Sequence, residues 1–468
     1  MGEAQFSHFV SIQLVKGNGI PLYVQLYDQL VFLIREGKLS PGFLLPPVRK
    51  LAAFLSVNPG TAVASYRELE QNGYILTKRG SGSFVADRNG PPVALLPVAG
   101  EDADQPLSDM RRISIDPVLF PTKTLKDFIS RIIDRDGPAA FTADGIEGYM
   151  PLREAVAAAV RDEGINTAPD LIQIVSGSQQ GIDIAARALL RHGSFVIAEN
   201  PTYPGAVSVF RACGAKVADI PLVRGGLDLD RLEELVVRFR PSLLYVTPDI
   251  QVPTGISYTM QVKARILALA RRYDFYILED DYANGLCYGI PGRSMKAIDT
   301  HDRVLYLRSV SALFAAGLRI AFLIMPRALV PAIQKMKYLS DLATAGLTQR
   351  VLDLYLREGK WTPYVEKVRA ASEKKLRLSL SAAARHLPPS VSVQKPAGGL
   401  SLWLTFPKDT DMPALLAAAR ARGFLFMDGA PFFIRGSSTP TLRVSFGAAS
   451  EETIQEAFEV LGELAGKR

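Results

Sequence analysis

The apolar pattern at the beginning of the chain predicts three short helices and a hairpin. The first helix, over 22–37, has its apolar residues at helical spacing: Leu22, Leu26, Leu30, Leu33 and Ile34. Pro47 is suited to begin a second helix, and Asn58 is suited to cap a third that ends at Gly73. Two short strands, 74–78 and 83–86, then flank a glycine-rich tip, which is typical of a β-hairpin.

Short helices followed by a basic hairpin are typical of a winged helix-turn-helix, whose third helix enters the major groove of DNA. The side chains that we expect to face DNA are Arg49, Asn58, Thr61, Ser65, Arg67, Lys78 and Arg79. The apolar face of the third helix is assigned to Val63, Tyr66 and Leu69. A small helical bundle with solvated charges is the alternative, and the hairpin favours the DNA-binding interpretation.

No periodic pattern is present between residues 89 and 112. This segment contains Pro91, Pro92, Pro97 and Pro106, together with an acidic run at 101–104. We therefore interpret it as an interdomain linker that its prolines partly extend. The sequence thus predicts a DNA-binding domain over 14–88, a linker over 89–112 and a larger domain over 113–468.

Beyond residue 113, short β-rich runs alternate with amphipathic helical patterns, which predicts an α/β layered fold. The expected strands are Leu171–Ser176, Phe195–Glu199, Lys216–Ile220, Leu243–Val246, Phe275–Leu278, Val304–Leu307 and Ile320–Ile324. Helices such as Gly181–Leu190 and Gln261–Tyr273 are expected between them. Because ligands bind outside the carboxyl ends of the strands in parallel α/β sheets, the residues that follow each strand are the candidates for a site.

Hydroxyl-bearing, acidic and aromatic residues follow these strands: Ser176–Gln180, Glu199–Tyr203, Thr247-Pro248, Glu279–Tyr282, Ser309 and Ser311. Together they suit a phosphorylated, aromatic ligand that can be protonated. Each of them alone has a simpler interpretation. Ser178 is as well explained as a helix cap, the acidic pair as solvated charge, and Tyr203 as part of the core.

The composition narrows the class of protein. With 48% hydrophobic and 22% charged residues among 468, the chain is an ordinary globular protein of two or more domains. Two cysteines form no disulfide framework and indicate a reducing cytosol, and four scattered histidines form no zinc motif. No apolar stretch is long enough to span a bilayer, and no signal peptide is expected.

The formal net charge of +7 is spread unevenly along the chain. Residues 1–88 contain nine Lys and Arg against six Asp and Glu, so positive charge is denser there than in the remainder. The beginning of the chain is therefore where an anionic partner is expected.

Four motifs of the first domain resemble the GntR family of bacterial DNA-binding domains. They are Leu22-Tyr23-x-Gln25-Leu26, Leu45-Pro46-x-x-Arg49-x-Leu51-Ala52, Tyr66-Arg67-Glu68-Leu69-Glu70-x-x-Gly73-Tyr74 and Gly80-Ser81-Gly82-Ser83-Phe84-Val85. The resemblance covers roughly residues 20–87. It implies a winged helix-turn-helix that binds a double-stranded DNA operator.

The larger domain resembles the fold-type-I aminotransferases, which depend on pyridoxal phosphate and have a large and a small domain. The motifs are Gly148-Tyr149-x-Pro151-Leu152-Arg153, Ser178-Gln179-Gln180, Pro201-x-Tyr203-Pro204-Gly205, Pro253-Thr254-Gly255, Glu279-Asp280-Asp281-Tyr282, Ser309-x-Ser311 with Arg319, and Leu442-Arg443-x-x-Phe446-Gly447. A GntR-type winged helix joined to such a domain is the layout of MocR-type transcriptional regulators. This resemblance implies a cytoplasmic bacterial protein that forms a head-to-tail homodimer.

The resemblance also implies a set of cofactor-binding residues: Ser178, Gln179, Tyr203, Gln251, Asp280, Tyr282, Ser309, Ser311 and Arg319. Asp280 would keep the pyridine nitrogen of pyridoxal phosphate protonated, so that the ring can accept electrons. Tyr282 would bond the phenolic oxygen and Tyr203 would stack on the ring. Arg443 resembles the arginine that binds the carboxylate of an amino-acid effector. Some relatives have a basic residue where this chain has Gly205, so Arg443 is the one clear carboxylate-binding cation in the sequence and a dicarboxylate effector is less secure.

One essential residue of the family is missing. Its Schiff-base lysine lies in a Ser-Lys pair seven residues before the phosphate-binding arginine, and this chain has Ala312 there, seven residues before Arg319. Without the amine, the cofactor has no covalent attachment and the 1,3-proton shift has no base. We therefore expect no catalytic residue, no efficient transamination, and pyridoxal phosphate that is bound non-covalently or absent.

Two origins of Ala312 fit the sequence: natural loss of the lysine in a sensing domain, and an engineered or recent Lys→Ala change. Neutral decay would also have altered Asp280, Tyr282, Ser309 and Arg319, so their presence favours the second origin. The predicted function is a DNA-binding regulator whose aminotransferase-like domain binds pyridoxal phosphate or a pyridoxal–amine adduct as its effector. The small-molecule partner is accordingly expected to be an amino acid, an amine or a form of vitamin B6. A pyridoxal-phosphate-dependent aminotransferase, with an accessory N-terminal domain and inactivated by the Lys→Ala change, is the alternative.

Overall fold

The structure is a computed structural model. It describes residues 6–15, 21–40, 42–71, 74–78, 82–86, 107–289, 292–310, 313–314, 316–435 and 439–466. The chain divides into two compact units, Met1–Ala94 and Leu95–Arg468. This division falls inside the segment 89–112 that we predicted as a linker.

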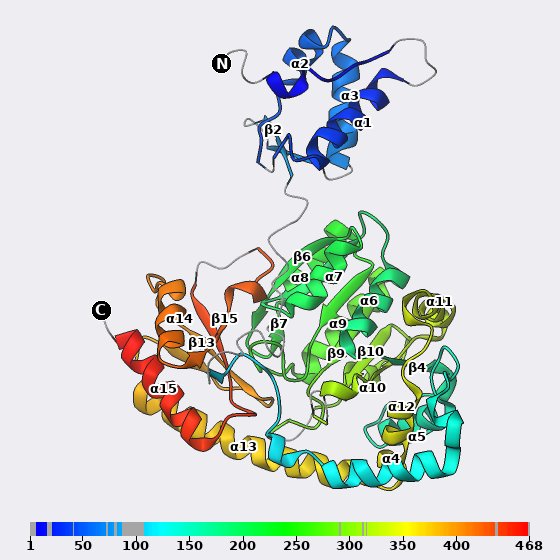
Figure 1. Cartoon of the computed structure of the whole chain (residues 1–468), viewed down its shortest axis with the longest axis vertical. Helices are drawn as coiled ribbons and strands as arrows, with labels where there is room; N and C mark the ends of the chain where they lie inside the picture. The colour runs from blue at the N-terminus through cyan, green and yellow to red at the C-terminus, as the bar shows by residue number, and fades with distance from the viewer. Residues whose placement is uncertain are drawn as a thin grey trace. The chain divides into compact units, whose positions relative to one another are not determined.

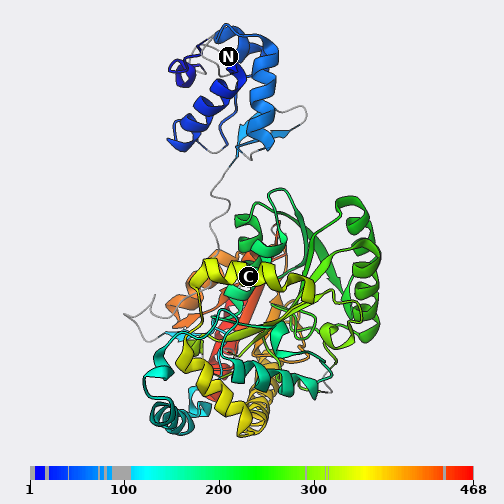
Figure 2. The same cartoon turned by 90° about the vertical axis from the view of Figure 1, so that its right-hand side faces the viewer.

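The first unit contains the predicted helices and hairpin (Figures 1 and 2). Its elements are α1 (Leu22–Arg35), α2 (Val48–Phe54), α3 (Pro59–Gln71), β1 (Ile75–Lys78) and β2 (Gly82–Val85). The two strands pair antiparallel, with Ile75 opposite Val85 and Lys78 opposite Gly82. Asn58 begins α3 as expected, because its side-chain Oδ1 accepts a hydrogen bond from the Gly60 N–H at 2.8 Å.

The predicted apolar face of α3 is wrong by one position. Val63 is 53% exposed, whereas Ala62, Tyr66 and Leu69 are buried. Positions 62, 66 and 69 are separated by four and three residues and share one face, while position 63 is turned by about 100° from position 62. Ser65 follows this buried face and is also fully buried, so its expected exposure to DNA is wrong as well.

The core of the first unit extends to residues before position 14. Phe9 and Ile12 are buried in the same hydrophobic cluster as Leu26 and Leu51. Phe9 ends a short 3₁₀ helix, η2 (Ser7–Phe9), and Ile12 follows it. The domain therefore begins earlier than the predicted boundary.

The second unit is built on an eight-stranded sheet with the order β4-β11-β10-β9-β8-β5-β6-β7 (Figure 1). The strands are β4 (Ile172–Val175), β5 (Phe195–Asn200), β6 (Lys216–Val223), β7 (Gly226–Leu227), β8 (Leu243–Val246), β9 (Tyr276–Asp281), β10 (Val304–Ser309) and β11 (Ala321–Ile324). All seven predicted strands are present. The sheet is mixed rather than wholly parallel, because β11 is antiparallel to β10 and β4, and β7 is antiparallel to β6.

Helices cover both faces of this sheet, which makes it the middle layer of an α/β sandwich. Neighbouring residues of β8 alternate between two cores, since Leu244 and Val246 face one and Leu243 and Tyr245 face the other. The flanking helices are α4 (Thr122–Asp136), α5 (Met150–Arg161), α6 (Ser178–Leu189), α7 (Pro204–Ala212), α8 (Leu229–Phe239), α9 (Met260–Tyr273), α10 (Met295–Ile298), α11 (Val330–Asp341) and α12 (Gly346–Arg357).

A smaller layer follows the long helix α13 (Trp361–His386). It is an antiparallel sheet with the order β12-β13-β16-β15, covered by helices. Its elements are β12 (Ser392–Gln394), β13 (Ser401–Thr405), α14 (Met412–Ala421), β14 (Phe424–Leu425), β15 (Met427–Asp428), β16 (Thr441–Ser445) and α15 (Glu451–Gly466). The predicted large and small domains of a fold-type-I architecture are therefore both present.

The last residues of the predicted linker belong to this smaller layer. Strand β3 (Ser108–Asp109) pairs in parallel with β14. Met110 is buried, its N–H donates to the Leu425 carbonyl at 2.9 Å, and its carbonyl accepts from the Ser445 N–H at 2.9 Å. The segment 107–112 is thus part of the folded unit, whereas 89–106 lies outside the described residues. None of the described helices combines the length and apolarity that crossing a bilayer requires.

Candidate functional site

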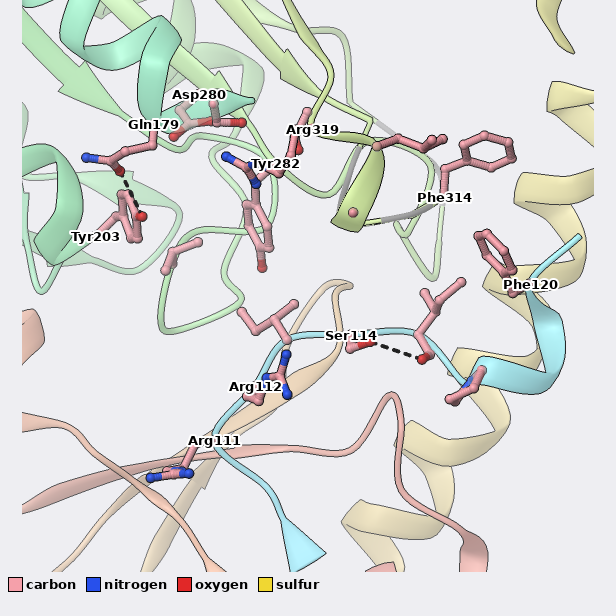
Figure 3. Close-up of a pocket in the computed structure, with 18 of the residues that line it drawn as sticks. Arg111, Arg112, Ser114, Phe120, Gln179, Tyr203, Asp280, Tyr282, Phe314 and Arg319 are labelled. Atoms are coloured by element: carbon pink, nitrogen blue, oxygen red, sulfur yellow. Dashed lines mark hydrogen bonds between the residues drawn. The ribbon is translucent and has the colours of Figure 1, made fainter. Parts of the chain in front are cut away.

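A cavity of about 830 Å³ lies at the carboxyl edge of the large sheet, where the topology predicts a ligand site. Figure 3 shows two walls: residues from the sheet edge, including Asp280, Tyr282 and Arg319, and a segment that carries Arg112 and Phe120. Because β11 runs antiparallel to β10, its start lies at the same edge as the ends of the parallel strands. This reversal brings Arg319 to the cavity.

Asp280 provides a buried carboxylate at the base of the cavity. Its Oδ2 accepts a hydrogen bond from the Tyr245 hydroxyl at 2.8 Å, and its Oδ1 has no partner among the described residues. The pKa of Asp280 is raised to about 7, chiefly by burial and also by the carboxylates of Asp281 and Glu199, while the hydrogen bond from Tyr245 opposes the rise. A cationic N–H donor at Oδ1 would therefore stabilise the charged form.

The two neighbours of Asp280 in the acidic run have structural roles. Glu279 accepts the backbone N–H groups of Met295 and Lys296 at 2.7 and 2.8 Å and so caps the start of α10. Asp281 accepts a hydrogen bond from the Tyr306 hydroxyl at 2.5 Å. Only Asp280 of these three carboxylates lines this cavity.

A corner that suits an anion forms where α6 begins. Gly177, at φ 100°, precedes the helix, and a Cβ atom on it would lie 2.4 Å from Nη2 of Arg319. The absence of a side chain therefore lets the guanidinium approach the backbone, where its Nη2 donates to the Ser176 carbonyl at 3.3 Å. The buried Ser178 hydroxyl has no partner among the described residues. A free hydroxyl, a guanidinium and a helix N-terminus together suit a phosphate.

Tyr203 is held in place by Gln179. The Tyr203 hydroxyl donates to Oε1 of Gln179 at 2.9 Å, and Nε2 of Gln179 donates to the Gly205 carbonyl at 3.1 Å. A Cβ on Gly205 would lie 2.5 Å from the Tyr203 ring, so this glycine makes room for the ring. Burial raises the pKa of the Tyr203 hydroxyl to about 12, which keeps it a donor.

Arg443, on β16, is a buried cation that faces the cavity. Its Nη2 donates to the Arg111 carbonyl at 2.5 Å, while its Nε has no partner among the described residues. No carboxylate in the described part of the chain forms an ion pair with it. Burial lowers its pKa to about 10, so it remains charged at neutral pH and a ligand carboxylate would relieve the cost of its desolvation.

The remaining predicted cofactor residues have different outcomes. Tyr282 and Ser309 line the cavity, and the Tyr282 ring points into it in Figure 3. Ser311 and Ala312 lie outside the described residues. No lysine is found among the described residues that line the cavity.

The predicted position of Gln251 needs correction. Its side chain is fully buried and does not line the cavity. Its amide Nε2 donates to Oε2 of Glu199 at 3.0 Å and to the Pro201 carbonyl at 2.8 Å. Gln251 therefore holds the loop, and its neighbour Val252 faces the cavity instead.

Sequence reasoning missed the wall formed by residues 111–120. Arg111, Arg112, Ile113 and Ser114 line the cavity, together with Phe120. The absence of any periodic pattern led us to assign 107–112 to the linker. The one sequence signal for this wall is a single apolar residue, Met110, in front of the basic pair Arg111 and Arg112. One apolar residue is too weak a pattern to predict a strand, so the wall is recognised only in the tertiary structure.

Only some of the residues predicted to contact DNA lie on the surface of the first unit. Arg49, Asn58 and Arg67 are exposed and Thr61 is partly exposed. Ser65 is buried and its Oγ has no partner among the described residues. Lys78 ends β1, and Arg79 lies outside the described residues.

Two families match the two units. Residues 22–85 match the family described as bacterial regulatory proteins, gntR family, and residues 117–461 match aminotransferase class I and II. Among curated relatives, the 2-aminoadipate transaminase of Thermus thermophilus is 34% identical over 74% of this chain and 87% of its own.

A second relative matches over both units. The "Probable rhizopine catabolism regulatory protein MocR" of Rhizobium meliloti is 26% identical over 94% of this chain and 93% of its own. Among solved structures, LysN, the alpha-aminoadipate aminotransferase from Thermus thermophilus complexed with N-(5'-phosphopyridoxyl)-L-leucine, is 31% identical with a TM-score of 0.73, over 77% of this chain and 92% of its own. The chain therefore belongs to the aminotransferase class I and II family and carries a GntR-family regulatory domain in front of its aminotransferase-like domain, in the layout of MocR-type transcriptional regulators.

Proposed function

We propose that this protein is a DNA-binding regulator whose effector is pyridoxal phosphate or a pyridoxal–amine adduct that it binds without a covalent bond. The observation that carries the proposal is that the site has the groups to bind a pyridoxal ligand, while the sequence lacks the lysine that would attach it. Among the described residues, Oδ1 of Asp280 has no hydrogen-bond partner, Arg443 forms no ion pair, and Ser178 and Arg319 form a corner that suits an anion. The sequence has Ala312 where this family uses its lysine.

The residues of the cavity fit a pyridoxal group. Such a group, when bound, supplies a protonatable ring that withdraws electrons from an attached amine. Asp280 would accept a hydrogen bond from the protonated ring nitrogen, and Tyr282 would donate to the phenolic oxygen. Tyr203 would cover one face of the ring. Ser178, Ser309 and Arg319 would bind the phosphate.

Binding and catalysis are separable in this site. The groups that would bind and orient the ring and a ligand carboxylate are present, whereas the amine that would attach the cofactor and move a proton is replaced by the methyl group of Ala312. We therefore infer that ligand binding is the output of this site and that transamination is negligible. The Lys→Ala change at position 312 accounts for that loss.

The GntR-family domain implies DNA binding, and the proposed regulation couples it to the cavity. Regulation requires two states of the protein with different affinity for the ligand and different placement of the winged helices. We propose that these states belong to a head-to-tail homodimer in the cytoplasm, because two winged helices would then read two half-sites.

A second function is favoured by the match to a transaminase at 34% identity. On this alternative, a form of the protein with lysine at position 312 would be a working aminotransferase with an accessory N-terminal domain that has no regulatory role on DNA. The two proposals differ in what the first unit does for the cell, so DNA binding is the property to test.

A mobility-shift assay with the full chain tests the regulator function. The DNA fragments would be the promoter regions that flank its gene, with a coding fragment of equal length as the control. We expect retardation of at least one promoter fragment at a protein concentration that leaves the coding fragment free. Equal retardation of both, or of neither at low salt, would overturn the proposal.

A further inference from the structure

Four guanidinium groups and one carboxylate line the cavity among the described residues. The cations are Arg111, Arg112, Arg319 and Arg443, and the carboxylate is Asp280. A pyridoxal–amino acid ligand with one carboxylate has two anionic groups, its phosphate and that carboxylate, so the cationic groups of the cavity outnumber them.

Three of the four cations have an assigned counterpart. Arg111 forms a two-pronged ion pair with Asp109, with Nε to Oδ1 at 2.9 Å and Nη2 to Oδ2 at 3.1 Å. Arg319 belongs to the corner that suits a phosphate, and Arg443 is the cation for a ligand carboxylate. Asp280 is in turn matched by a protonated ring nitrogen, so it neutralises none of them.

Arg112 is the cation that remains. Its side chain is exposed on the cavity wall, and it forms no hydrogen bond or ion pair with any residue that the structure describes. It is also close in the chain to the carboxylate site, because the carbonyl of the preceding Arg111 accepts the hydrogen bond from Arg443. Figure 3 shows Arg112 across the hollow from the Tyr282 ring.

We propose that Arg112 binds a second anionic group of the effector, so that the effector is an amino acid with an acidic side chain. This inference rests on the proposed function, because it presumes that the cavity holds a pyridoxal–amino acid ligand. One carboxylate binds Arg443, and the acidic side chain binds the planar guanidinium of Arg112. This proposal differs from the expectation based on Gly205, which made a dicarboxylate effector less secure.

Isothermal titration of the full chain with two reduced adducts tests this inference. The probes are N-(5'-phosphopyridoxyl)-L-glutamate and N-(5'-phosphopyridoxyl)-L-glutamine, which have nearly the same size and differ in one negative charge. We expect the glutamate adduct to bind about three- to fivefold more tightly to the unmodified protein, because an exposed charge-assisted pair has a modest net effect.

Variants then assign the preference to one side chain. Arg112→Gln should bring the two dissociation constants within about twofold by weakening the glutamate adduct alone, and Arg112→Lys should retain part of the preference. The matched control is Arg231→Gln, since Arg231 is an exposed arginine on α8 that pairs with Glu234 away from the cavity. It should retain the full preference.

The outcomes separate this inference from the proposed function. Tight binding of both adducts with equal affinity, or a preference that survives in Arg112→Gln, overturns the inference and leaves the proposed function standing. No binding of either adduct or of pyridoxal phosphate by the folded protein overturns both. A charge preference that only Arg112→Gln abolishes supports the inference.

Discussion

Replacing Asp280 by asparagine should stabilise the ligand-free protein and weaken its binding of pyridoxal phosphate. Asparagine is close to aspartate in size and can still accept the hydrogen bond from Tyr245. It cannot carry the charge that burial disfavours, nor can it neutralise a protonated ring nitrogen. Stability and ligand binding are therefore expected to change in opposite directions.

The structure sets the magnitude of the stability change. Burial raises the pKa of Asp280 from 3.8 to about 7. Between these values the folded state binds more protons than the unfolded state, so this carboxyl makes the protein less stable as the pH rises. At about 1.4 kcal/mol per pKa unit, the cost reaches at most about 4 kcal/mol above pH 7. The stability gap between Asp280→Asn and the parent should widen by about 2 kcal/mol from pH 5.5 to pH 8.

Differential scanning calorimetry at the two pH values, together with a pyridoxal phosphate titration, measures both effects. We expect the melting temperature of Asp280→Asn to exceed that of the parent by more at pH 8 than at pH 5.5. We expect its pyridoxal phosphate affinity to be roughly 10- to 100-fold lower, because a charge-assisted hydrogen bond is lost.

Asp249→Asn is the matched control. Asp249 is mostly buried and its pKa is raised to about 6, but it pairs with the fully buried Lys263 outside this cavity. Its loss should destabilise the protein and leave the pyridoxal phosphate affinity unchanged. An Asp280→Asn variant that binds pyridoxal phosphate as tightly as the parent, or that is less stable at pH 8, would refute the reasoning.

Three further predictions follow from the same structure. Ala312→Lys should restore covalent attachment of pyridoxal phosphate. The attachment would be seen as a new visible absorbance band and as a borohydride-trapped adduct at position 312. A folded variant that shows neither would contradict the assignment of this position to the family's lysine. Arg67→Ala should weaken promoter binding and make the slope of log affinity against log salt shallower by about 1, and an unchanged slope would remove Arg67 from the DNA-contacting set. Ser65→Ala should change promoter affinity by no more than about twofold and leave the melting temperature unchanged or slightly higher. The reason is that the buried Ser65 hydroxyl has no partner among the described residues. A large loss of promoter affinity would mean that Ser65 contacts DNA.

The sequence predicted the elements better than their arrangement. The strands were recognisable because β-rich runs such as Leu243–Val246 are buried on both faces, which leaves a continuous apolar run. The reversed direction of β11 was not predictable, because a short buried strand has the same composition in either orientation. That reversal is what brings Arg319 to the edge of the sheet.

Candidate site residues were predictable where a motif constrained the backbone. Asp280, Tyr203 and Arg443 were assigned from motifs, and all three line the cavity. Gln251 was misplaced because a motif locates a loop but not the direction of a side chain within it. Arg112 was missed because its place in the cavity wall depends on β3 pairing with β14, a contact between segments more than 300 residues apart that local pattern does not reveal.

The most direct test of the central claim is the effect of pyridoxal phosphate on DNA affinity, measured by fluorescence anisotropy with a retarded promoter fragment and the full chain. We predict that saturating pyridoxal phosphate, or its reduced adduct with glutamate, changes the dissociation constant for DNA by at least about fivefold, the lower end of typical coupling between sites. Arg319→Gln, which removes the cation of the phosphate corner, should abolish the change. Ligand that binds the cavity and leaves DNA affinity unchanged would contradict the claim.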